Sequence, residues 1–437
     1  MNERIKRLRE ISLSAIKTIS HERAALVTEF YKKELNKEDS VPVQRAKAFR
    51  YILSNKKISI IEDELIVGER GPAPAAVPTY PEITLHSLKD LNILNDREKV
   101  SYKVPEETRS VYENEIIPFW KGASQRERIM GKMSTEWKDA YEAGVFTEFQ
   151  EQRAPGHTVA GGNIYSTGLL EMLGLEDFDD SIVGSVIETH SVDELTKQNS
   201  DQLAAMKISA IAIVEFALRY SKELEKFIKE EKREWRKKEL AEMARVCKKV
   251  PAYAPSTFHE ALQYYWFMHV GVIIESNPWD SFNPGRLDQH LYPFYKKEIE
   301  EGTLTRERAK ELLQSFWIKF HNHPAPPKVG VTAKESNTYT DFALINLGGL
   351  DVNGNDAVNE LSYLILDVIE EMRILQPSSM IQVSSKNPDE YIRRALNIIK
   401  SGFGQPSVFN TDVIIEELLR QGKSLRDARN GGASGCV

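Results

Sequence analysis

The chain has 437 residues, and 58 Lys and Arg against 65 Asp and Glu give it a formal net charge of −7 at pH 7. Apolar residues make up 41% and charged residues 28%, which is ordinary for a globular protein and excludes a fibrous or wholly disordered chain. No basic block offsets the acidic balance, so a nucleic-acid partner is not expected.

Cysteine usage and the N-terminal residues indicate a compartment. The two cysteines, Cys247 and Cys436, are too few for a disulfide framework and fit a reducing environment. Residues 1–20 contain neither an apolar core nor a small-residue cleavage site, so no secretory signal is predicted. No window approaches the ~20 apolar residues of a membrane span. We therefore expect a cytoplasmic protein without a membrane partner.

The N-terminal third of the chain is mainly helical in pattern. Residues 1–55 place apolar side chains at helical spacing and predict two or three helices. Residues 57–68 are typical of a strand or short hairpin that ends in a glycine turn, and the prolines of residues 71–82 predict a loop. Residues 106–150 again read as helices. Three aromatic residues of this last segment are expected to face a core: Trp120, Trp137 and Tyr141.

From residue 200 onward, long helices give way to alternating elements. Residues 200–249 predict helix with a charged, solvated second half, and residues 256–276 begin at Ser256, a good N-cap residue, and end in an apolar run. The strand candidates are residues 270–274, 342–347 and 380–384. The helix candidates are residues 304–320, 355–373, 388–401 and 411–420. Such alternation predicts an α/β fold of βα units around a sheet or barrel.

The last seven residues surround one thiol with small residues. They read Gly431-Gly432-Ala433-Ser434-Gly435-Cys436-Val437. Because glycine allows the backbone to approach other groups closely, a thin loop of this composition could carry the Cys436 thiol into a confined space. The alternative interpretation is a disordered tail with an incidental cysteine.

Two other stretches place polar residues in loops. His157 lies in a glycine-rich segment, and histidine is the commonest general acid or base near neutral pH, although a purely structural histidine is the alternative. Residues 334–342 follow a proline-rich loop and run into a predicted strand. Ser336 and Asp341 there suit the rim of a pocket in an α/β protein, and a solvated loop is the alternative.

A further loop and three histidines favour structural roles. Asp280, Arg286 and Asp288 are expected to form an ion-pair network that fixes a loop, because buried arginine is usually paired with carboxylates. An isolated H-x-H spacing is a weak zinc signal, and without HExxH or CxxC partners we predict no metal site. The three histidines concerned are His290, His321 and His323. Walker A, Rossmann and G-x-S-x-G motifs are absent from the sequence.

Six stretches resemble the glycyl radical enzymes, the superfamily of pyruvate formate-lyase, and occur in that family's order. They are TEFQEQRAPGHTV, NPGRLDQHLYPFY, PAPPKVGVT, KESNTYTDF, LQPSS and GGASGCV. The final G-C-V resembles the thiyl-cysteine loop of the dehydratase and decarboxylase branches, in which Glu comes next. Val437 after Cys436 differs from the paired cysteines of pyruvate formate-lyase proper. QRAPGHTV and KES-TYTDF most resemble the members that dehydrate trans-4-hydroxy-L-proline.

The resemblance implies roles for individual residues. Cys436 would hold the transient thiyl radical that abstracts a substrate hydrogen, and His157 would lie near the departing hydroxyl. Ser336 would bind the substrate carboxylate, and Asp341 would contact the ring amine or hydroxyl. Two aromatic residues would wall the pocket: Phe149 and Phe342.

The resemblance also implies a reaction, a cofactor state and a fold. The reaction is radical dehydration of a small hydroxylated substrate, with trans-4-hydroxy-L-proline giving 1-pyrroline-5-carboxylate and water. No separate cofactor would bind, because the glycyl radical is installed by a radical S-adenosylmethionine activating enzyme. The family fold is a ten-strand α/β barrel built from two five-strand halves. Residues 1–437 would be a truncated pyruvate formate-lyase-type domain, with outer helices and the first half-barrel but no glycyl radical domain, and alone would be inactive. A homodimer is compatible with the family.

Two kinds of alternative stay open. Within the family, the chain could belong to a diol dehydratase that uses glycerol or propanediol, or to another G-C-V-E lyase or decarboxylase. Ser336 and Asp341 suit a zwitterionic amino acid better than a neutral diol. From a different class, the chain could be an inactive fragment that binds a partner, such as a separately encoded C-terminal half.

Overall fold

The computed structural model describes residues 1–33, 38–143, 145, 159–160, 169, 200–275, 282–327 and 343–432. The N-terminal elements are α1 (Glu3–Ser14), β1 (Thr18–Ser20), α2 (Glu22–Lys32), α3 (Val41–Asn55), β2 (Ala76–Pro78), α4 (Leu88–Asp96), α5 (Glu106–Val111), η1 (Tyr112–Ile116), α6 (Ile117–Trp120), α7 (Gln125–Lys132) and α8 (Thr135–Glu142). The next are β3 (Val159–Ala160), α11 (Ser200–Glu230), α12 (Glu234–Lys249), α13 (Phe258–Glu275), β4 (Phe282–Asn283), β5 (Gly285–Arg286), α14 (Leu287–Glu300) and α15 (Arg306–His321). The last are β6 (Leu344–Gly348), α16 (Glu360–Met372), β7 (Ser378–Val383), α17 (Asp389–Ile398), η5 (Ile399–Phe403), β8 (Ser407–Asn410), α18 (Thr411–Arg420) and α19 (Leu425–Asn430).

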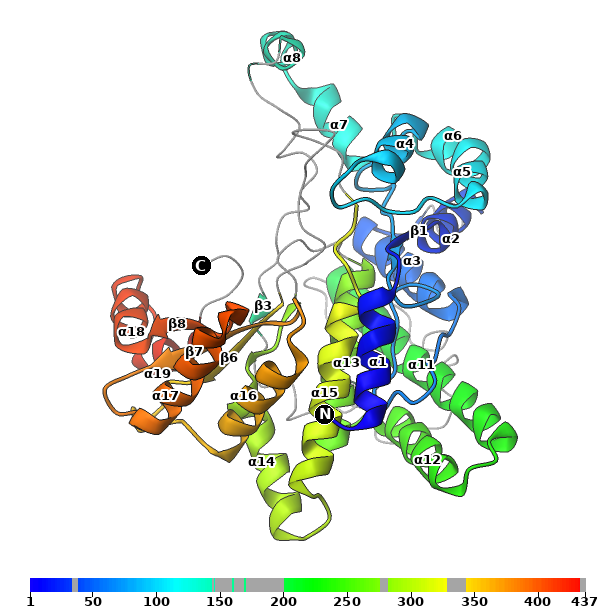
Figure 1. The fold of residues 1–437 in the computed structure, drawn as a ribbon. Helices are drawn as coiled ribbons and strands as arrows, with labels where there is room; N and C mark the ends of the chain where they lie inside the picture. Colours follow the sequence, from blue (N-terminus) through cyan, green and yellow to red (C-terminus); the bar gives the residue numbers. More distant parts are fainter. Residues whose placement is uncertain are drawn as a thin grey trace.

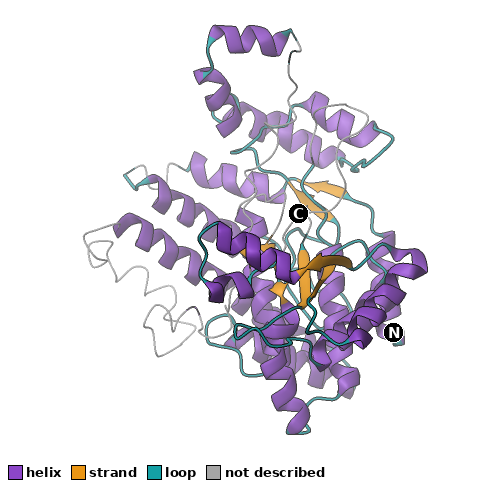
Figure 2. Ribbon diagram, turned by 90° about the vertical axis from the view of Figure 1, so that its left-hand side faces the viewer, coloured by secondary structure: helices purple, strands orange, loops and turns teal. Residues whose placement is uncertain are grey.

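The elements form a helical body with strands at one side. Figure 1 shows β6, β7 and β8 at one side, α1, α13 and α15 in the middle, and α11 and α12 at the opposite side. Figure 2 shows the strands lying among the helices. The helices expected within residues 1–55, 200–249, 304–320, 355–373 and 411–420 are confirmed. Among the helices that the structure describes, none is long and apolar enough to cross a bilayer.

Six of the eight described strands make a row of five parallel positions, and β1 and β2 pair with each other in a separate sheet. β5 pairs with β6, β6 with β7, and β7 with β8, all in parallel. β3 pairs in parallel with β4, and only Pro284 separates β4 from β5. Because proline cannot donate to a ladder, it divides one bent strand into two short ones. The row β3, β4 with β5, β6, β7, β8 is the α/β half-barrel that was expected.

Side chains alternate between the two faces of the sheet. Ile345, Leu347 and Ile381 join the main hydrophobic core with side chains of α14, α16 and α17, which cover this face. Asn346 and Gln382 occupy the opposite face and are also buried. A parallel strand is normally buried on both faces, so polar side chains on the second face mark it as different from a simple apolar core.

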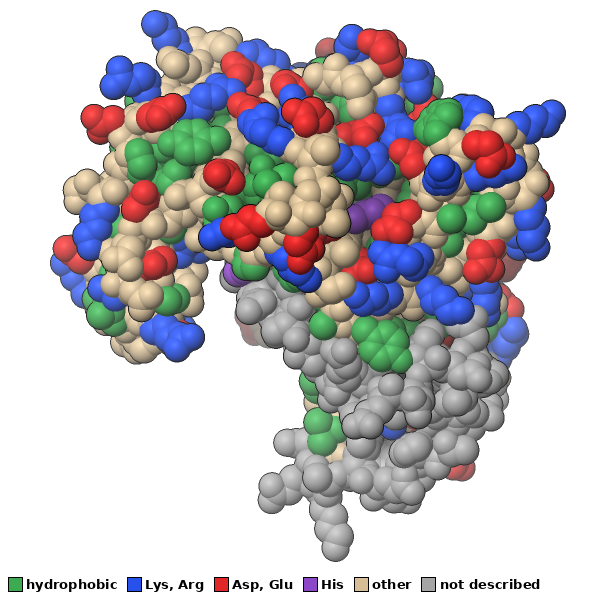
Figure 3. Space-filling view, turned by 90° about the horizontal axis from the view of Figure 1, so that it is seen from below, with side chains coloured by type: hydrophobic (Ala, Val, Ile, Leu, Met, Phe, Trp, Pro, Cys, Tyr) green, Lys and Arg blue, Asp and Glu red, His purple; other side chains and the backbone are tan. Residues whose placement is uncertain are grey.

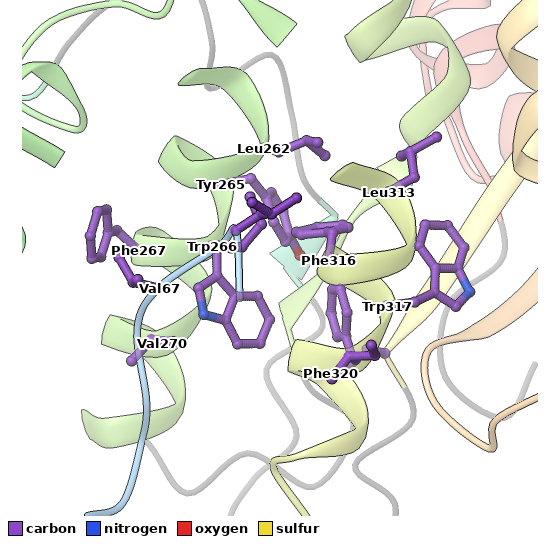
Figure 4. Close-up of a cluster of buried hydrophobic side chains, with 14 of the residues drawn as sticks. Val67, Leu262, Tyr265, Trp266, Phe267, Val270, Leu313, Phe316, Trp317 and Phe320 are labelled. Atoms are coloured by element: carbon purple, nitrogen blue, oxygen red, sulfur yellow. The ribbon is translucent and has the colours of Figure 1, made fainter. Parts of the chain in front are cut away.

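An aromatic core joins α13 to α15. The ring of Trp266 lies 6.0 Å from that of Phe316 and 5.1 Å from that of Phe320, both nearly edge to face. Tyr265 lies 5.8 Å from Phe316, and Figure 4 shows these rings between the two helices. Each such pair contributes ~0.5–1.5 kcal/mol beyond its buried area. The two helices therefore form a rigid centre on which the outer segments pack.

Residues 270–274 belong to α13, and the prediction of a strand there is wrong. Fifteen of the 18 residues of α13 are buried. A helix that is buried on nearly every side has no polar face, so its sequence lacks the period that identifies a helix. The predicted N-cap is wrong by one residue, since the backbone N–H of Glu260 donates to Thr257 Oγ1 at 3.2 Å.

Residues 57–68 form no strand or hairpin, contrary to the prediction. Residues 63–68 of the segment are buried, and side chains of neighbouring helices satisfy the backbone there. The Gln263 amide accepts from Val67 N at 2.9 Å and donates to Val67 O at 2.7 Å. Trp266 Nε1 donates to Gly68 O at 2.8 Å. Because buried backbone groups need partners from any source, an apolar run can be extended without pairing to a strand.

Of the three aromatic residues within residues 106–150 that were expected to face a core, one is buried and two are half-buried. Trp120 is buried as expected. α8 has no buried residue, and Trp137 and Tyr141 stack on each other with ring centroids 5.4 Å apart instead of entering a core. Residues at i and i+4 lie on the same face of a helix, so they can contact each other or a core equally well. The sequence pattern therefore could not distinguish these two arrangements.

Four buried ionisable residues link the extended segment to α15. Lys319 Nζ lies 2.9 Å from Glu64 Oε2 and also pairs with Glu69, whose Oε2 lies 2.7 Å from His323 Nε2. Burial raises the pKa of Glu64 to about 7. Burial acts in the same direction on Glu69, but attraction to Lys319 and His323 prevails and lowers the pKa of Glu69 to about 2. Glu69 is thus the carboxylate whose negative charge neutralises the positive charge of Lys319.

Replacing Glu64 with Gln is expected to change stability in a pH-dependent manner. Above its ordinary pKa of 4.5 and below the folded value of about 7, Glu64 holds more protons in the folded than in the unfolded chain. Ionisation of Glu64 therefore lowers stability as pH rises through this window. The free energy of unfolding of Glu64→Gln relative to wild type should rise by at most ~1.4 kcal/mol per pH unit. Urea unfolding at several pH values between these two pKa values measures the difference in free energy between the variant and wild type. The exposed Glu62→Gln variant is the control, and a constant difference would contradict the prediction.

Candidate active site

The residues predicted for the active site lie outside the described part of the chain. They are Phe149, His157, Ser336, Asp341, Phe342 and Cys436. Asp280, expected in the ion-pair network, also lies outside it. The structure does describe the elements that follow or precede them in sequence, and these define the surroundings of a candidate site.

Two of the flanking strands begin at the same end of the parallel row. β3 begins at Val159, two positions after His157, and β6 begins at Leu344, three positions after Asp341. β3 pairs with β4 and β6 with β5, each in parallel, so all four strands run in one direction. The N-terminal ends of all four strands therefore lie along the same side of the sheet.

Residues Gly431 and Gly432 pack against the polar face of the sheet. Gln382 Nε2 donates to Gly431 O at 3.0 Å and lies 3.3 Å from Asn346 Oδ1. A Cβ atom on Gly432 would lie 2.5 Å from Asn346 Oδ1 and 2.9 Å from Gln382 Nε2. Only glycine permits so close an approach of the backbone. The sheet therefore fixes the start of the segment that contains Cys436, four positions later in sequence.

Asn346 and Gln382 were not among the predicted site residues. Asn346 lies in the apolar strand β6 and Gln382 lies in the apolar second half of β7, with 2% and 1% of their surface exposed. A buried amide is retained where it has hydrogen-bond partners, because an unpaired one costs ~1–3 kcal/mol. A polar residue inside an apolar strand pattern is the sequence signal that could have identified them.

Arg286 and Asp288, two members of the predicted ion-pair network, instead form a clamp on one glycine, while Asp280 lies outside the described residues. Arg286 Nη2 donates to Gly348 O, and Gly348 N donates to Asp288 Oδ2, each at 2.8 Å. Gly348 ends β6 with φ +68°, and its own N–H and C=O bond to these two side chains. Burial raises the pKa of Asp288 and lowers that of Arg286, yet no ion pair joins these two described side chains within 4.0 Å. The sequence spacing predicted that Arg286 and Asp288 would pair with each other. It could not show that Gly348 lies between them and forms a hydrogen bond with each.

The histidines and the described cysteine occupy other surroundings. Among the described residues, no three His, Cys, Asp or Glu side chains are grouped so as to hold a metal ion. Burial lowers the pKa of His321 to about 4, whereas His323 lies against Glu69. Cys247 is fully buried in the helical core, and burial raises the pKa of its thiol well above the ordinary value. A thiol of this kind is a poor nucleophile.

One face of the molecule carries both signs of charge. Figure 3 shows Lys and Arg side chains interspersed with Asp and Glu over the described residues of one face. Opposite charges on the surface of the described residues form exposed pairs, such as Arg306 with Asp367 at 2.6 Å. Neither sign forms a continuous field on this face, so it offers no strong electrostatic attraction to a highly charged partner.

Three features of this chain occur together: the row of parallel strands, the clamp at the end of β6, and the glycine segment on the polar face of the row. Together they define the chain as half of an α/β-barrel enzyme. The sequence matches the Pyruvate formate lyase-like family over residues 1–437, and the chain belongs to this family. It is 49% identical over 436 residues to trans-4-hydroxy-L-proline dehydratase of Clostridioides difficile, a match that covers 100% of this chain and 54% of that protein.

Solved structures give the same result. The crystal structure of hydroxyproline dehydratase from Clostridioides difficile with bound trans-4-hydroxy-L-proline matches with a TM-score of 0.90 and 47% identity, covering 100% of this chain and 55% of that one. The B12-independent glycerol dehydratase of Clostridium butyricum matches with a TM-score of 0.87 and 29% identity, covering 100% and 54%. The chain thus spans about half the length of the relatives it matches.

Proposed function

We propose that this chain belongs to a glycyl radical dehydratase that converts trans-4-hydroxy-L-proline to 1-pyrroline-5-carboxylate and water. The observation that carries the proposal is the fit of Gly431 and Gly432 against Asn346 and Gln382 on the buried polar face of a parallel strand row. The identity of 49% to a dehydratase of this substrate, against 29% to a glycerol dehydratase, favours hydroxyproline over a diol.

The length of the cysteine segment supports this assignment. Cys436 follows Gly432 by four residues, and four extended residues span at most ~14 Å. From Asn346 back to Leu344 the strand rises only ~7 Å. The segment is therefore long enough to bring Cys436 past the amino end of β6. Asp341 and His157 come just before β6 and β3 in the sequence, so they adjoin the same N-terminal side of the sheet.

We assign the roles as follows. A glycyl radical supplied by another part of the protein, and installed by a radical S-adenosylmethionine activating enzyme, provides the unpaired electron. The Cys436 thiyl takes a hydrogen atom from the ring carbon next to the hydroxylated carbon, and the thiol later returns it. His157 lies by the departing hydroxyl, which leaves as water with a proton that the ring amine gives up as the C=N bond forms. The thiol returns its hydrogen atom to the carbon that lost the hydroxyl. Ser336 binds the carboxylate and Asp341 the ring amine.

The pocket must also exclude water and oxygen. Phe149 and Phe342 wall it, because a carbon radical survives only where competing reactants are kept out. One-electron chemistry needs the neutral thiol, so Cys436 requires none of the cationic neighbours that lower the pKa of a cysteine nucleophile. No other cofactor is needed for these steps, and the protein contributes by positioning the substrate.

We propose that residues 1–437 form the outer helices and first half-barrel and that turnover requires a second half-barrel with a glycyl radical domain. β8 borders the described strand row and still carries exposed side chains, including Val408. Val413 and Leu419 on the adjacent α18 are also exposed. A parallel edge strand with apolar neighbours is usually covered, which favours a polypeptide partner on this side. The same observation fits the alternative of a partner-binding half.

Substrate consumption after anaerobic activation tests the proposal. The full polypeptide, its activating enzyme and S-adenosylmethionine are incubated with trans-4-hydroxy-L-proline, glycerol or propane-1,2-diol. Mass spectrometry should detect the pyrroline carboxylate from hydroxyproline alone, and residues 1–437 by themselves should give no product. Turnover of a diol without turnover of hydroxyproline would reject the substrate. A spectroscopically observed glycyl radical with no turnover of any of the three would reject the reaction class.

A further inference from the structure

Arg286 joins the end of β6 to the end of α19. Its Nη2 donates to Gly348 O at 2.8 Å, and its Nη1 donates to Arg429 O at 2.8 Å. Gly348 is the last residue of β6, and Arg429 precedes Gly431 by two positions. The Arg286 side chain is buried, and its bond to the Gly348 carbonyl is shielded from water, whereas its bond to the Arg429 carbonyl is partly buried.

The carbonyl of Gly348 is a fixed point. Gly348 N donates to Asp288 Oδ2 at 2.8 Å, and Ser362 Oγ donates to the same carboxylate oxygen at 2.5 Å. A Cβ on Gly348 would overlap Tyr391 Oη, so the glycine is enclosed on its remaining side. One end of the Arg286 bridge is therefore anchored to β6, α14 and α16.

Arg429 is held from its other side as well. Its Nη1 donates to Val352 O at 3.1 Å. A Cβ on Gly354, which has φ +81°, would lie 2.8 Å from Arg429 Nη2. The last turn of α19 is thus tied through its carbonyl to Arg286 and through its side chain to the loop after β6. Little freedom remains at the point where the chain enters Gly431 and Gly432.

We propose that Arg286 is a positioning residue for the cysteine loop. It sets the start of the segment that carries Cys436 relative to the strand row, and it acts through backbone carbonyls without touching the substrate. The inference rests on the proposed function, since it assigns Cys436 as the reacting group. A planar guanidinium presents two separate nitrogen donors to two carbonyls at once, whereas the single ammonium of lysine cannot hold this geometry.

The expected kinetic effect is selective. Displacement of a reacting group by ~1 Å costs about 100-fold in rate, so Arg286→Lys should lower kcat by about 10- to 100-fold. KM for hydroxyproline should stay within about twofold, because no substrate contact is lost. The yield of glycyl radical measured by electron paramagnetic resonance should stay at the wild-type level.

The comparison needs a matched variant and a structural control. Arg306→Lys alters an exposed arginine that pairs with Asp367, and it should behave as wild type in every measurement. Thermal unfolding of both variants shows whether the fold is kept, and Arg286→Gln is the second variant at the position. A fall in kcat with KM, Tm and radical yield preserved supports the inference. An Arg286→Lys enzyme equal to Arg306→Lys, or one that loses kcat only in proportion to Tm, overturns it.

A substrate-independent measurement separates this inference from the proposed function. Hydrogen–deuterium exchange of peptides that cover residues 425–432 should be at least about tenfold faster in Arg286→Lys than in wild type, with other peptides unchanged. If wild-type protein fails to consume hydroxyproline, the proposed function fails, whereas the exchange result still tests the clamp. Unchanged exchange at residues 425–432 would reject the role of Arg286 whatever the substrate.

Discussion

Lys319→Met is expected to lower the free energy of unfolding by about 3–5 kcal/mol, because it leaves buried carboxylate charge without a counter-ion. Lys319 pairs with Glu64 and Glu69, and the side chains of all three are at most 4% exposed. Glu64 can take up a proton near neutral pH, since burial raises its pKa to about 7. Glu69 cannot do so without cost, because its pKa lies near 2 in the intact cluster. Urea unfolding at neutral pH measures the loss.

Lys310→Met provides the matched control on the same helix. Lys310 pairs with Glu371 at 2.8 Å, but both side chains are more than a fifth exposed. Such pairs contribute about 0–1 kcal/mol. The double variant Lys319→Met with Glu69→Gln should recover part of the loss, because it removes the uncompensated charge together with its partner. If Lys319→Met costs no more than Lys310→Met, the buried cluster does not carry the stabilising role assigned to it.

The cluster connects stability to the arrangement of the site. It ties the irregular segment that ends at Glu69 to α15, and α15 packs through its aromatic face on α13. α16 packs on α15 and covers one face of the strand row. A change at Lys319 should therefore alter stability first and activity only as the folded fraction falls. This distinguishes it from a change at Arg286.

Much of the fold followed from local pattern. Amphipathic helices such as α16 and α18 have one apolar face, and β6 and β7 have short apolar runs between turn residues, so periodicity identified all four. Pattern failed where tertiary structure removed the contrast between faces. α13 is buried on almost all sides, and the segment 57–68 takes its hydrogen bonds from helix side chains. Neither condition is visible in local sequence.

The site could be predicted only to the level of its motif. The glycine-rich sequence around Cys436 indicated a close backbone approach, and the positions of Gly431 and Gly432 agree with this. The partners of that approach are separated from it by tens of residues. Asn346, Gln382 and Arg286 acquire their contacts only when parallel strands are aligned, because register decides which side chain is beside which backbone group.

Gly432→Ala is expected to lower kcat by at least about 100-fold, close to the complete loss expected for Cys436→Ala. The new Cβ would lie 2.5 Å from Asn346 Oδ1 and 2.9 Å from Gln382 Nε2. Both amides are buried and joined by a hydrogen bond, so they cannot retreat without leaving polar groups unpaired. The glycine segment must then lift from the sheet, which displaces Cys436. Steady-state kinetics of the activated enzyme measures the effect.

Gly431→Ala separates this steric cause from a general loss of glycine flexibility. A Cβ at position 431 would come within 2.6 Å of Leu418 Cδ1, the end of a half-buried side chain that can rotate away. Its kcat should stay within about tenfold of wild type, because a rotamer change costs only ~0.5–1.5 kcal/mol. Adding Asn346→Ser to Gly432→Ala makes room for the methyl group and should restore part of the rate. Equal losses in the two glycine variants, with no recovery in the double variant, would show that the loop needs glycine for flexibility and not for its contact with Asn346 and Gln382.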